Sequence, residues 1–318
     1  MITCYLAPME GITTYIYRNA YHRCFGGIDR YFTPFIASKK MNSREINEIL
    51  PEHNEGMTVV PQILTNRAEE FLQIAEQIAA FGYRTVNLNL GCPSGTVTAR
   101  KRGAGFLGVP EQLDEFLYTI FEKSPLKISI KTRIGISSEE EWDRLLTIYR
   151  KYPIEELIIH PRLQQEQYNG TPHKSAYKKA QDVLRIPLCY NGDIHSPDAF
   201  AALVSDFPNV SHVMLGRGIL KDPYLVHRLR GNPDTVPDKD TIKAFHDELF
   251  AHYAEAMSGE TPVLYKMKDL WTYLSQSFTN PEKYLKKIRK ANTFADYKAA
   301  VGSLLREQEL LREYIDAT

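Results

Sequence analysis

The sequence predicts a (β/α)8 barrel (TIM barrel) followed by a small C-terminal all-α helical bundle. Three observations carry this prediction: eight short β-rich runs occur in the first two thirds of the chain, helical stretches separate most of them, and β-like runs are absent from the last quarter. Eight βα units over about 220 residues match the count and length of such a barrel. A doubly wound open sheet is the alternative fold.

Each predicted strand is a run of apolar and β-branched residues that stops at a polar, glycine or proline cluster. The helical stretch over residues 66–82 shows the intervening unit, with Asn66 as the expected N-cap, apolar residues at three- and four-residue spacing, and Gly82 at its end. The eight runs cover residues 2–8, 30–36, 58–64, 85–91, 127–133, 156–162, 187–193 and 212–218.

The C-terminal part of the chain has the pattern of four amphipathic helices. One covers residues 241–257, and the others begin near Thr261, Asn280 and Thr293. Proline and aspartate punctuate residues 220–240, which indicates a linker. We therefore expect a catalytic barrel over residues 1–235 and a helical domain over residues 240–318.

Composition excludes several classes of protein. Thirty-nine basic residues balance thirty-nine acidic ones among 318, so net charge does not indicate a polyanionic partner, and a nucleic-acid surface would have to be a local patch. The four cysteines form no CxxC pair and no metal-ligand spacing, which predicts neither disulfides nor a metal site. With no membrane-length apolar stretch and no signal-like N-terminus, we expect a cytoplasmic protein.

The strand ends carry residues that a plain barrel does not require. Because the carboxyl ends of barrel strands meet at one mouth, these residues are candidates for a single site. The glycines after the seventh and eighth runs, with Arg217, are typical of a phosphate site. Lys131 and His160 are placed to address the polar edge of a flavin ring. The full set is Pro8, Met9, Glu10, Gln62, Asn89, Cys92, Lys131, Arg133, His160, Arg162, Asn191, Gly192, Asp193, Gly216 and Arg217.

These motifs resemble, in order and spacing, those of the tRNA-dihydrouridine synthases. The segments that carry the resemblance are LAPMEGIT, PQIL, NLNLGCPSGTVTARKRGAGFL, KTRIG, IHPR, YNGDI and LGRGIL, and together they span roughly residues 5–220. The helical tail agrees with the RNA-binding domain of that family. Glycine-rich turns alone would be weak evidence, whereas the GCP cysteine combined with the Lys-x-Arg, His-x-Arg and Asn-Gly-Asp strand ends is specific.

The resemblance implies an FMN enzyme that reduces the 5,6 double bond of selected tRNA uridines with NADPH. It assigns FMN binding to Ala7, Pro8, Met9, Gln62, Lys131, His160, Asn191, Gly192, Asp193, Gly216 and Arg217. Hydride addition to uracil leaves a neighbouring carbon that needs a proton. An unperturbed thiol is mostly protonated at neutral pH, so Cys92 is the expected proton donor. Asn89, Arg133 and Arg162 are the expected substrate-binding residues at the base.

Two basic segments are candidate RNA contacts. Two groups of basic residues carry this assignment: Arg100, Lys101 and Arg102 follow the cysteine loop, and Lys283, Lys286, Lys287 and Lys290 lie on one side of a short predicted helix. Charge runs are usually solvated faces, so this assignment depends on the reading of the chain as a two-domain RNA enzyme.

For several residues a structural role is weighed against a functional one. A free cysteine is usually a buried structural thiol, which is the reading that we adopt for Cys4, Cys24 and Cys189 but not for Cys92. The aromatic residues Trp271, Tyr273 and Phe278 are expected in the core rather than as base-stacking platforms. His173 is either a substrate contact or a solvated side chain.

Two features depart from the family pattern: Pro161 stands between His160 and Arg162, and the run Arg100, Lys101 and Arg102 is unusually basic. Both lie where they would bear on substrate selection. The alternatives are a flavin enzyme that reduces a small molecule, a synthase that acts on ribosomal RNA, and an RNA-binding barrel without flavin. We expect a monomer.

Overall fold

The computed structural model describes residues 2–231 and 237–311. Eight parallel strands close into a barrel in chain order, with β8 pairing back onto β1. This confirms the predicted barrel and excludes the doubly wound sheet. Every strand falls inside a predicted run: β1 (Thr3–Leu6), β2 (Arg30–Ile36), β3 (Val59–Ile63), β4 (Thr85–Leu90), β5 (Lys127–Thr132), β6 (Leu157–Ile159), β7 (Leu188–Asn191) and β8 (His212–Leu215).

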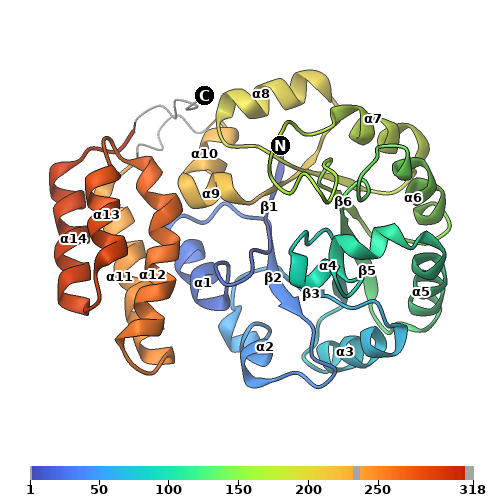
Figure 1. Ribbon diagram of the computed structural model, residues 1–318, viewed down its shortest axis with the longest axis horizontal. Helices are drawn as coiled ribbons and strands as arrows, with labels where there is room; N and C mark the ends of the chain where they lie inside the picture. Colours follow the sequence, from blue (N-terminus) through green and yellow to red (C-terminus); the bar gives the residue numbers. More distant parts are fainter. Residues whose placement is uncertain (1, 232–236, 312–318) are drawn as a thin grey trace.

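Helices form an outer layer around the strands (Figure 1). Their apolar faces pack on the barrel and bury aromatic and branched aliphatic side chains. The helices between and after the strands are α1 (Tyr15–Cys24), α2 (Ser43–Asn47), α3 (Ala68–Ala80), α4 (Gly95–Thr98), α5 (Pro110–Lys123), α6 (Glu141–Tyr149), α7 (Lys174–Val183), α8 (Pro197–Asp206), α9 (Arg217–Lys221) and α10 (Leu225–Leu229), with 3-10 turns η1 (Pro51–His53) and η2 (Gly103–Gly108).

Strand register decides which side chains reach the barrel mouth. In the β4–β5 pair, Asn87 lies opposite Ser129 and Asn89 lies opposite Lys131. Because side chains alternate along a strand, these four share one face, which is the inside of the barrel. A separate apolar cluster fills part of the barrel interior and comprises Tyr5, Ala7, Phe32, Val60, Ile158, Cys189 and Met214.

The start of α3 differs from the prediction. Arg67 rather than Asn66 precedes the helix, and no side chain caps its N-terminus. Asn66 instead donates from Nδ2 to the carbonyl of Arg100, at 3.1 Å. An asparagine before a helix fits a cap, but here a tertiary partner on the next barrel loop takes its side chain.

The four predicted C-terminal helices are present. They gather into a bundle at the side of the barrel (Figure 1). The bundle comprises α11 (Lys239–Ala256), α12 (Glu260–Leu274), α13 (Glu282–Lys290) and α14 (Phe294–Glu307), with a 3-10 turn η3 (Ser275–Ser277). The predicted boundary between the two domains, residues 235–240, lies partly outside the described residues, which resume at residue 237, and α11 begins at Lys239.

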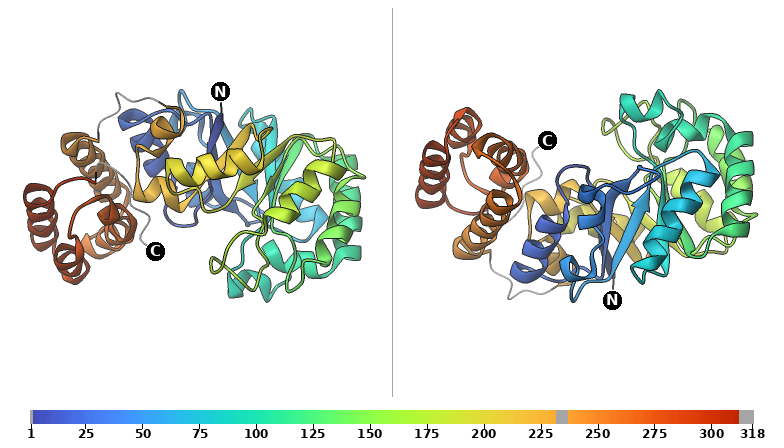
Figure 2. Two further views of the ribbon diagram at one scale, coloured as in Figure 1. Left: turned by 90° about the horizontal axis from the view of Figure 1, so that it is seen from above. Right: turned by 90° about the horizontal axis from the view of Figure 1, so that it is seen from below.

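The bundle contacts the barrel through an apolar interface with α1. Phe245 of α11 packs edge-on against Tyr17 and Phe25, with ring centroids 5.6 and 5.2 Å apart. The hydroxyls of Thr14 and Tyr253 are hydrogen-bonded at 3.1 Å. The two views of Figure 2 also place the bundle beside the barrel wall, away from α5 and α6.

Across residues 2–231 and 237–311, no helix has both the length and the apolar character needed to cross a membrane. In the same residues, no group of three or more His, Cys, Asp or Glu side chains is arranged to hold a metal ion. All four cysteines are free thiols.

Candidate active site

A cavity of about 310 Å³ opens at the carboxyl ends of the strands, and residues from all eight strands or their following loops line it. This volume lies at the lower end of the range of small-molecule sites. Every residue that the sequence suggested for the cofactor lines the cavity, together with Asn89, Cys92 and Arg133. Arg162, Arg100, Lys101, Lys286, Lys287 and Lys290 are not among the lining residues.

Cys92 lies in a tightly built loop at the edge of the cavity. Its backbone N–H and that of Gly91 donate to Asn89 Oδ1, at 2.9 and 3.0 Å. Its carbonyl accepts from the N–H of Ala104. Gly103 adopts φ +55°, and a Cβ there would lie 2.8 Å from the same carbonyl, so only glycine fits. The η2 turn therefore fixes the backbone that carries the thiol.

The environment of Cys92 keeps its thiol protonated. Burial raises the pKa of Cys92 above its ordinary value, whereas the Ser94 N–H and the charges of Lys131 and Arg133 act in the opposite direction. Because the raising influence is larger, the thiol holds its proton at neutral pH. The same two cations would stabilise the thiolate that remains after the proton leaves.

A chain of amide side chains forms the floor beside Cys92. Asn89 Nδ2 donates to Gln62 Oε1 at 2.7 Å, and Gln62 Nε2 donates to Asn87 Oδ1 at 2.8 Å. Asn87 Nδ2 in turn donates to Ser129 Oγ at 2.9 Å. These bonds leave Asn89 and Gln62 one amide N–H each for a ligand. The floor can therefore donate to an acceptor but has little capacity left to accept.

Lys131 is a cation without a counter-charge. Its ammonium group makes no hydrogen bond or ion pair with any described residue, although it lines the cavity. Burial and repulsion from Arg133 lower the pKa of Lys131 to about 8. A half-buried ammonium in this position is suited to an electron-rich or anionic ligand.

His160 is neutral. Burial first, and then the charges of Arg133, Lys131 and Arg162, hold the pKa of His160 well below its ordinary value. Arg162 Nη1 lies 3.3 Å from His160 Nε2, and because a guanidinium can only donate, Nε2 accepts and Nδ1 carries the proton. His160 therefore offers the cavity a neutral ring.

Arg162 lies in a different place from the one expected of a substrate-reading residue. It is 1% exposed and forms a two-bond ion pair with Asp193, at 3.0 and 2.5 Å. Its remaining donors reach the carbonyls of Asn169 and Gly170. Every donor is used inside the protein, so the geometry assigns Arg162 to holding the β6–α7 loop and Asp193.

Arg133 ties two loops together at the cavity wall. Its Nε donates to the Gly91 carbonyl at 2.9 Å, and its two terminal nitrogens donate to the carbonyls of Leu163 and Gln167, at 2.9 and 2.6 Å. The cysteine loop and the β6–α7 loop thus share one buried guanidinium. Burial lowers the pKa of Arg133 to about 10, which still leaves it charged at neutral pH.

The loops after β7 and β8 form the other end of the cavity. Asp193 has φ +45° and pairs with Arg217 at 2.9 Å as well as with Arg162. Burial opposes ionisation of Asp193, but hydrogen bonds from His195 and Arg162 hold its pKa far below the ordinary value. A Cβ on Gly218 would lie 2.2 Å from the Ile194 carbonyl, so glycine is required where the two loops meet.

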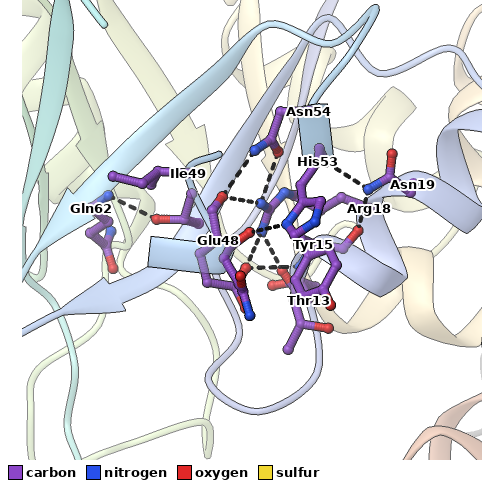
Figure 3. Close-up of polar contacts among 12 residues, drawn as sticks. Thr13, Tyr15, Arg18, Asn19, Glu48, Ile49, His53, Asn54 and Gln62 are labelled. Atoms are coloured by element: carbon purple, nitrogen blue, oxygen red, sulfur yellow. Dashed lines mark hydrogen bonds and ion pairs between the residues drawn. The ribbon is translucent and has the colours of Figure 1, made fainter. Parts of the chain in front are cut away.

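A buried polar cluster anchors the β1–α1 loop, which forms a further wall (Figure 3). Arg18 Nη1 donates to the carbonyl of Thr13 at 3.0 Å and pairs with Glu48 at 2.8 Å, and Arg18 Nη2 donates to Asn54 Oδ1 at 3.0 Å. Glu48 also accepts from the N–H of Tyr15. Burial raises the pKa of Glu48, although the charge of Arg18 and its hydrogen bond act to lower it. Because burying the two charges is costly, the hydrogen bonds around them are needed to stabilise the ion pair.

Two aromatic residues line the cavity against or without expectation: Tyr168 carried no prediction, and Tyr273, which was expected in the core, is instead half-buried and lines the cavity. Tyr168 is 51% exposed and lies between Arg133 and Arg217, whose guanidinium carbons are 5.5 and 4.7 Å from its ring centroid. The sequence feature that could have indicated Tyr168 as a cavity residue is its position in the loop after the sixth strand, because such loops form the barrel mouth. Tyr273 of α12 also lines the cavity, whereas Trp271 and Phe278 are buried in the bundle as expected. No sequence pattern relates Tyr273 to the barrel mouth.

The other candidates lie on the surface. Arg100 and Lys101 are exposed, while Arg102 pairs with Glu70 at 3.1 Å. Lys286, Lys287 and Lys290 are all exposed on α13. His173 bridges Glu139 and Glu166, each at 2.8 Å, and does not line the cavity.

Known proteins are similar in sequence to nearly the whole chain. A model of the family described as dihydrouridine synthase matches residues 5–317. The chain is 28% identical to a protein of Ralstonia nicotianae named tRNA-dihydrouridine(16) synthase, over 73% of this chain and 74% of that one. It is 25% identical to a probable tRNA-dihydrouridine synthase of Staphylococcus aureus, over 97% of this chain and 92% of that one. A tRNA-dihydrouridine(16) synthase of Pseudomonas putida is 26% identical over 93% and 95%.

Solved structures share the barrel at low sequence identity. Morphinone reductase superposes with a TM-score of 0.52 at 11% identity, covering 75% of this chain and 88% of that one. Histamine dehydrogenase from Rhizobium sp. 4-9 superposes with a TM-score of 0.54 at 12% identity, covering 77% of this chain and 48% of that one. These two similarities concern the fold alone.

Proposed function

The chain belongs to the dihydrouridine synthase family, and from that premise we propose that it binds FMN in the cavity and uses NADPH to reduce specific tRNA uridines to 5,6-dihydrouridine. The observation that carries this proposal is the pairing, on one cavity wall, of a protonated Cys92 thiol with the unpartnered Lys131 ammonium. A reductase of a carbon–carbon double bond needs both a proton donor and a group that holds the redox cofactor.

The donor set of the cavity fits FMN. Lys131 lacks a partner, and His195, which also lines the cavity, has a buried Nδ1 without a hydrogen-bond partner in the described residues. Lys131, His160 and Gln62 would hold the flavin ring, beside Ala7, Pro8 and Met9. The loops after β7 and β8 would hold the phosphate end, through Asn191, Gly192, Asp193, Gly216 and Arg217. The cofactor would thus satisfy polar groups that the chain leaves open.

When bound, FMN supplies a hydride to one carbon of the uracil 5,6 double bond. Cys92 supplies the proton for the neighbouring carbon: its S–H bond breaks, a C–H bond forms, and a thiolate remains. The positive charges of Lys131 and Arg133 stabilise that thiolate until it takes a proton from water. Asn89 keeps one N–H for a uracil oxygen, while Arg133 and Arg162 serve the base indirectly by fixing the loops around it.

RNA is the proposed partner of the surface outside the cavity. The target base is stacked in folded RNA, and flipping it into the cavity costs a few kcal/mol. Contacts to backbone phosphates can repay that cost, and the exposed cations Arg100, Lys101, Lys286, Lys287 and Lys290 are suited to them. We place the RNA-binding role in the helical domain over residues 240–318, with the barrel contributing the cysteine-side cations.

The test is to measure dihydrouridine in tRNA by mass spectrometry after reaction with wild-type protein, Cys92→Ala and the control Cys24→Ala. We expect Cys92→Ala to retain FMN and to lose at least about 100-fold in rate, because only the proton donor is removed. Cys24→Ala should react normally, since Cys24 does not line the cavity. Mapping of dihydrouridine along the tRNA begins at position 16, because that number appears in the names of the Ralstonia nicotianae and Pseudomonas putida relatives.

Two outcomes would contradict this proposal. An unchanged rate for Cys92→Ala would remove the proton-donor role. Binding of FMN without modification of any tRNA uridine would shift the assignment to ribosomal RNA or to a small-molecule acceptor.

A further inference from the structure

The helical bundle supplies part of the cavity wall. Tyr273 of α12 lines the cavity, and Lys266, two turns earlier on the same helix, donates from Nζ to the carbonyl of Gly11 at 2.6 Å. This bond joins positions 255 residues apart in the chain. One helix of the bundle therefore reaches the cavity both directly and through the β1–α1 loop.

The β1–α1 loop depends on that contact at its apex. Met9, Glu10 and Ile12 line the cavity, and Thr13 Oγ1 secures the base of the loop by accepting from the N–H of Met9 at 2.8 Å. Gly11 stands between these residues with φ +78°. Within the described part of the chain, Lys266 is the one hydrogen-bond donor to the Gly11 carbonyl.

The setting of Lys266 indicates a fixed rather than a solvated side chain. It is half-buried, and burial followed by repulsion from Arg44 lowers its pKa, while Asp269, Glu10 and Glu48 act to raise it. A Cβ added to Gly11 would lie only 3.4 Å from its ammonium nitrogen. The group is therefore seated directly over the loop that it holds.

We propose that Lys266 is a positioning residue that holds the β1–α1 loop in its cofactor-binding shape, so that the helical bundle shapes the flavin cavity in addition to contacting RNA. This inference rests on the proposed function for the identity of the cofactor. It makes α12 a link between the two parts of the chain, because a shift of the bundle would move Gly11 and the cavity residues on either side of it.

The experiment compares full-length Lys266→Met with wild type in the absence of RNA. We expect the FMN dissociation constant, measured by quenching of flavin fluorescence, to rise about tenfold, the value of one charge-assisted hydrogen bond. Amide hydrogen exchange in peptides covering residues 9–13 should become faster. Lys266→Arg, which keeps a charged donor, should restore both properties.

Lys268→Met is the matched control. It removes the same type of side chain from the same helix, and the Lys268 side chain makes no hydrogen bond or ion pair with a described residue. Wild-type FMN affinity and exchange in Lys266→Met would overturn the inference, as would equal effects in Lys268→Met. If Lys266→Met does not fold, Lys266→Gln, whose amide reaches less far, is judged by the same two criteria.

The exchange measurement separates this inference from the proposed function. A wild-type chain that takes up no FMN would contradict the proposed cofactor, whereas exchange at residues 9–13 would still decide whether Lys266 holds the loop.

Discussion

At the scale of single residues, Lys131 gives the site a pH dependence with a defined sign. Its pKa in the ligand-free protein is about 8, so the ammonium form predominates below that pH and is lost above it. If the charged form holds the flavin, FMN affinity should be constant at low pH and weaken above pH 8. The dissociation constant should rise by up to about tenfold per pH unit there, which fluorescence titration between about pH 6 and pH 9 would measure.

Lys131→Arg is the control for this profile, because a guanidinium stays charged across the whole range. Its affinity should be flat with pH, whatever its absolute value. A flat profile for the wild-type protein would show that the charge of Lys131 does not contribute to FMN binding.

Single residues also show where prediction from sequence stopped. The strand-end rule located Cys92, Lys131 and His160 at the cavity, because strand period and barrel topology together fix where those side chains go. It could not distinguish Arg133, at the cavity wall, from Arg162, which is buried behind it. Both follow a strand, and their positions are decided by which loop carbonyls fold back to meet them. The roles of all these residues stay predictions until the variants are made.

At the scale of elements, α13 gives the sharpest prediction about RNA. Lys286, Lys287 and Lys290 share one exposed side of the helix, whereas Lys283 lies over the ring of Tyr284 at 4.6 Å and near Glu307. Changing the three exposed lysines to glutamate should weaken tRNA binding at least about tenfold and reduce its salt dependence. Filter binding of tRNA at several salt concentrations measures both effects.

Arg289→Glu provides the comparison, since Arg289 is exposed on the same helix but about a sixth of a turn beyond Lys286, outside the lysine side. FMN affinity should be unchanged in the triple variant. Equal losses of tRNA binding from Arg289→Glu would indicate a general charge effect and would contradict a specific contact surface.

Strands were easier to predict than the contacts between elements. Each strand is short, alternates apolar and polar positions, and ends at a turn residue, so its place is encoded locally. The capping of α3 and the approach of Tyr273 to the cavity depend on segments far away in the chain. Such tertiary contacts leave no local pattern, which is why Asn66 and Tyr273 were assigned other roles from the sequence.

At the scale of the whole molecule, the interface between barrel and bundle determines whether the two parts unfold together. Phe245 is fully buried between Tyr17 and Phe25, and the Tyr253 hydroxyl bonds to Thr14 beneath it. Apolar burial of this kind couples the two parts, since neither can unfold without exposing the other's aromatic surface. We therefore expect a single thermal unfolding transition of the wild-type protein in calorimetry.

Phe245→Ala tests this coupling against Phe250→Ala, which removes the same side chain from the same helix. Phe250 packs inside the bundle against Phe294 and Tyr297. Each change should lower the free energy of unfolding by about 3–5 kcal/mol. Only Phe245→Ala, at the interface, should split the thermal unfolding transition into two. Two transitions in the wild-type protein would mean that the bundle unfolds as a separate unit. In that case the aromatic interface would be too weak to make the two parts unfold together, and the coupling argued from Phe245 would be wrong.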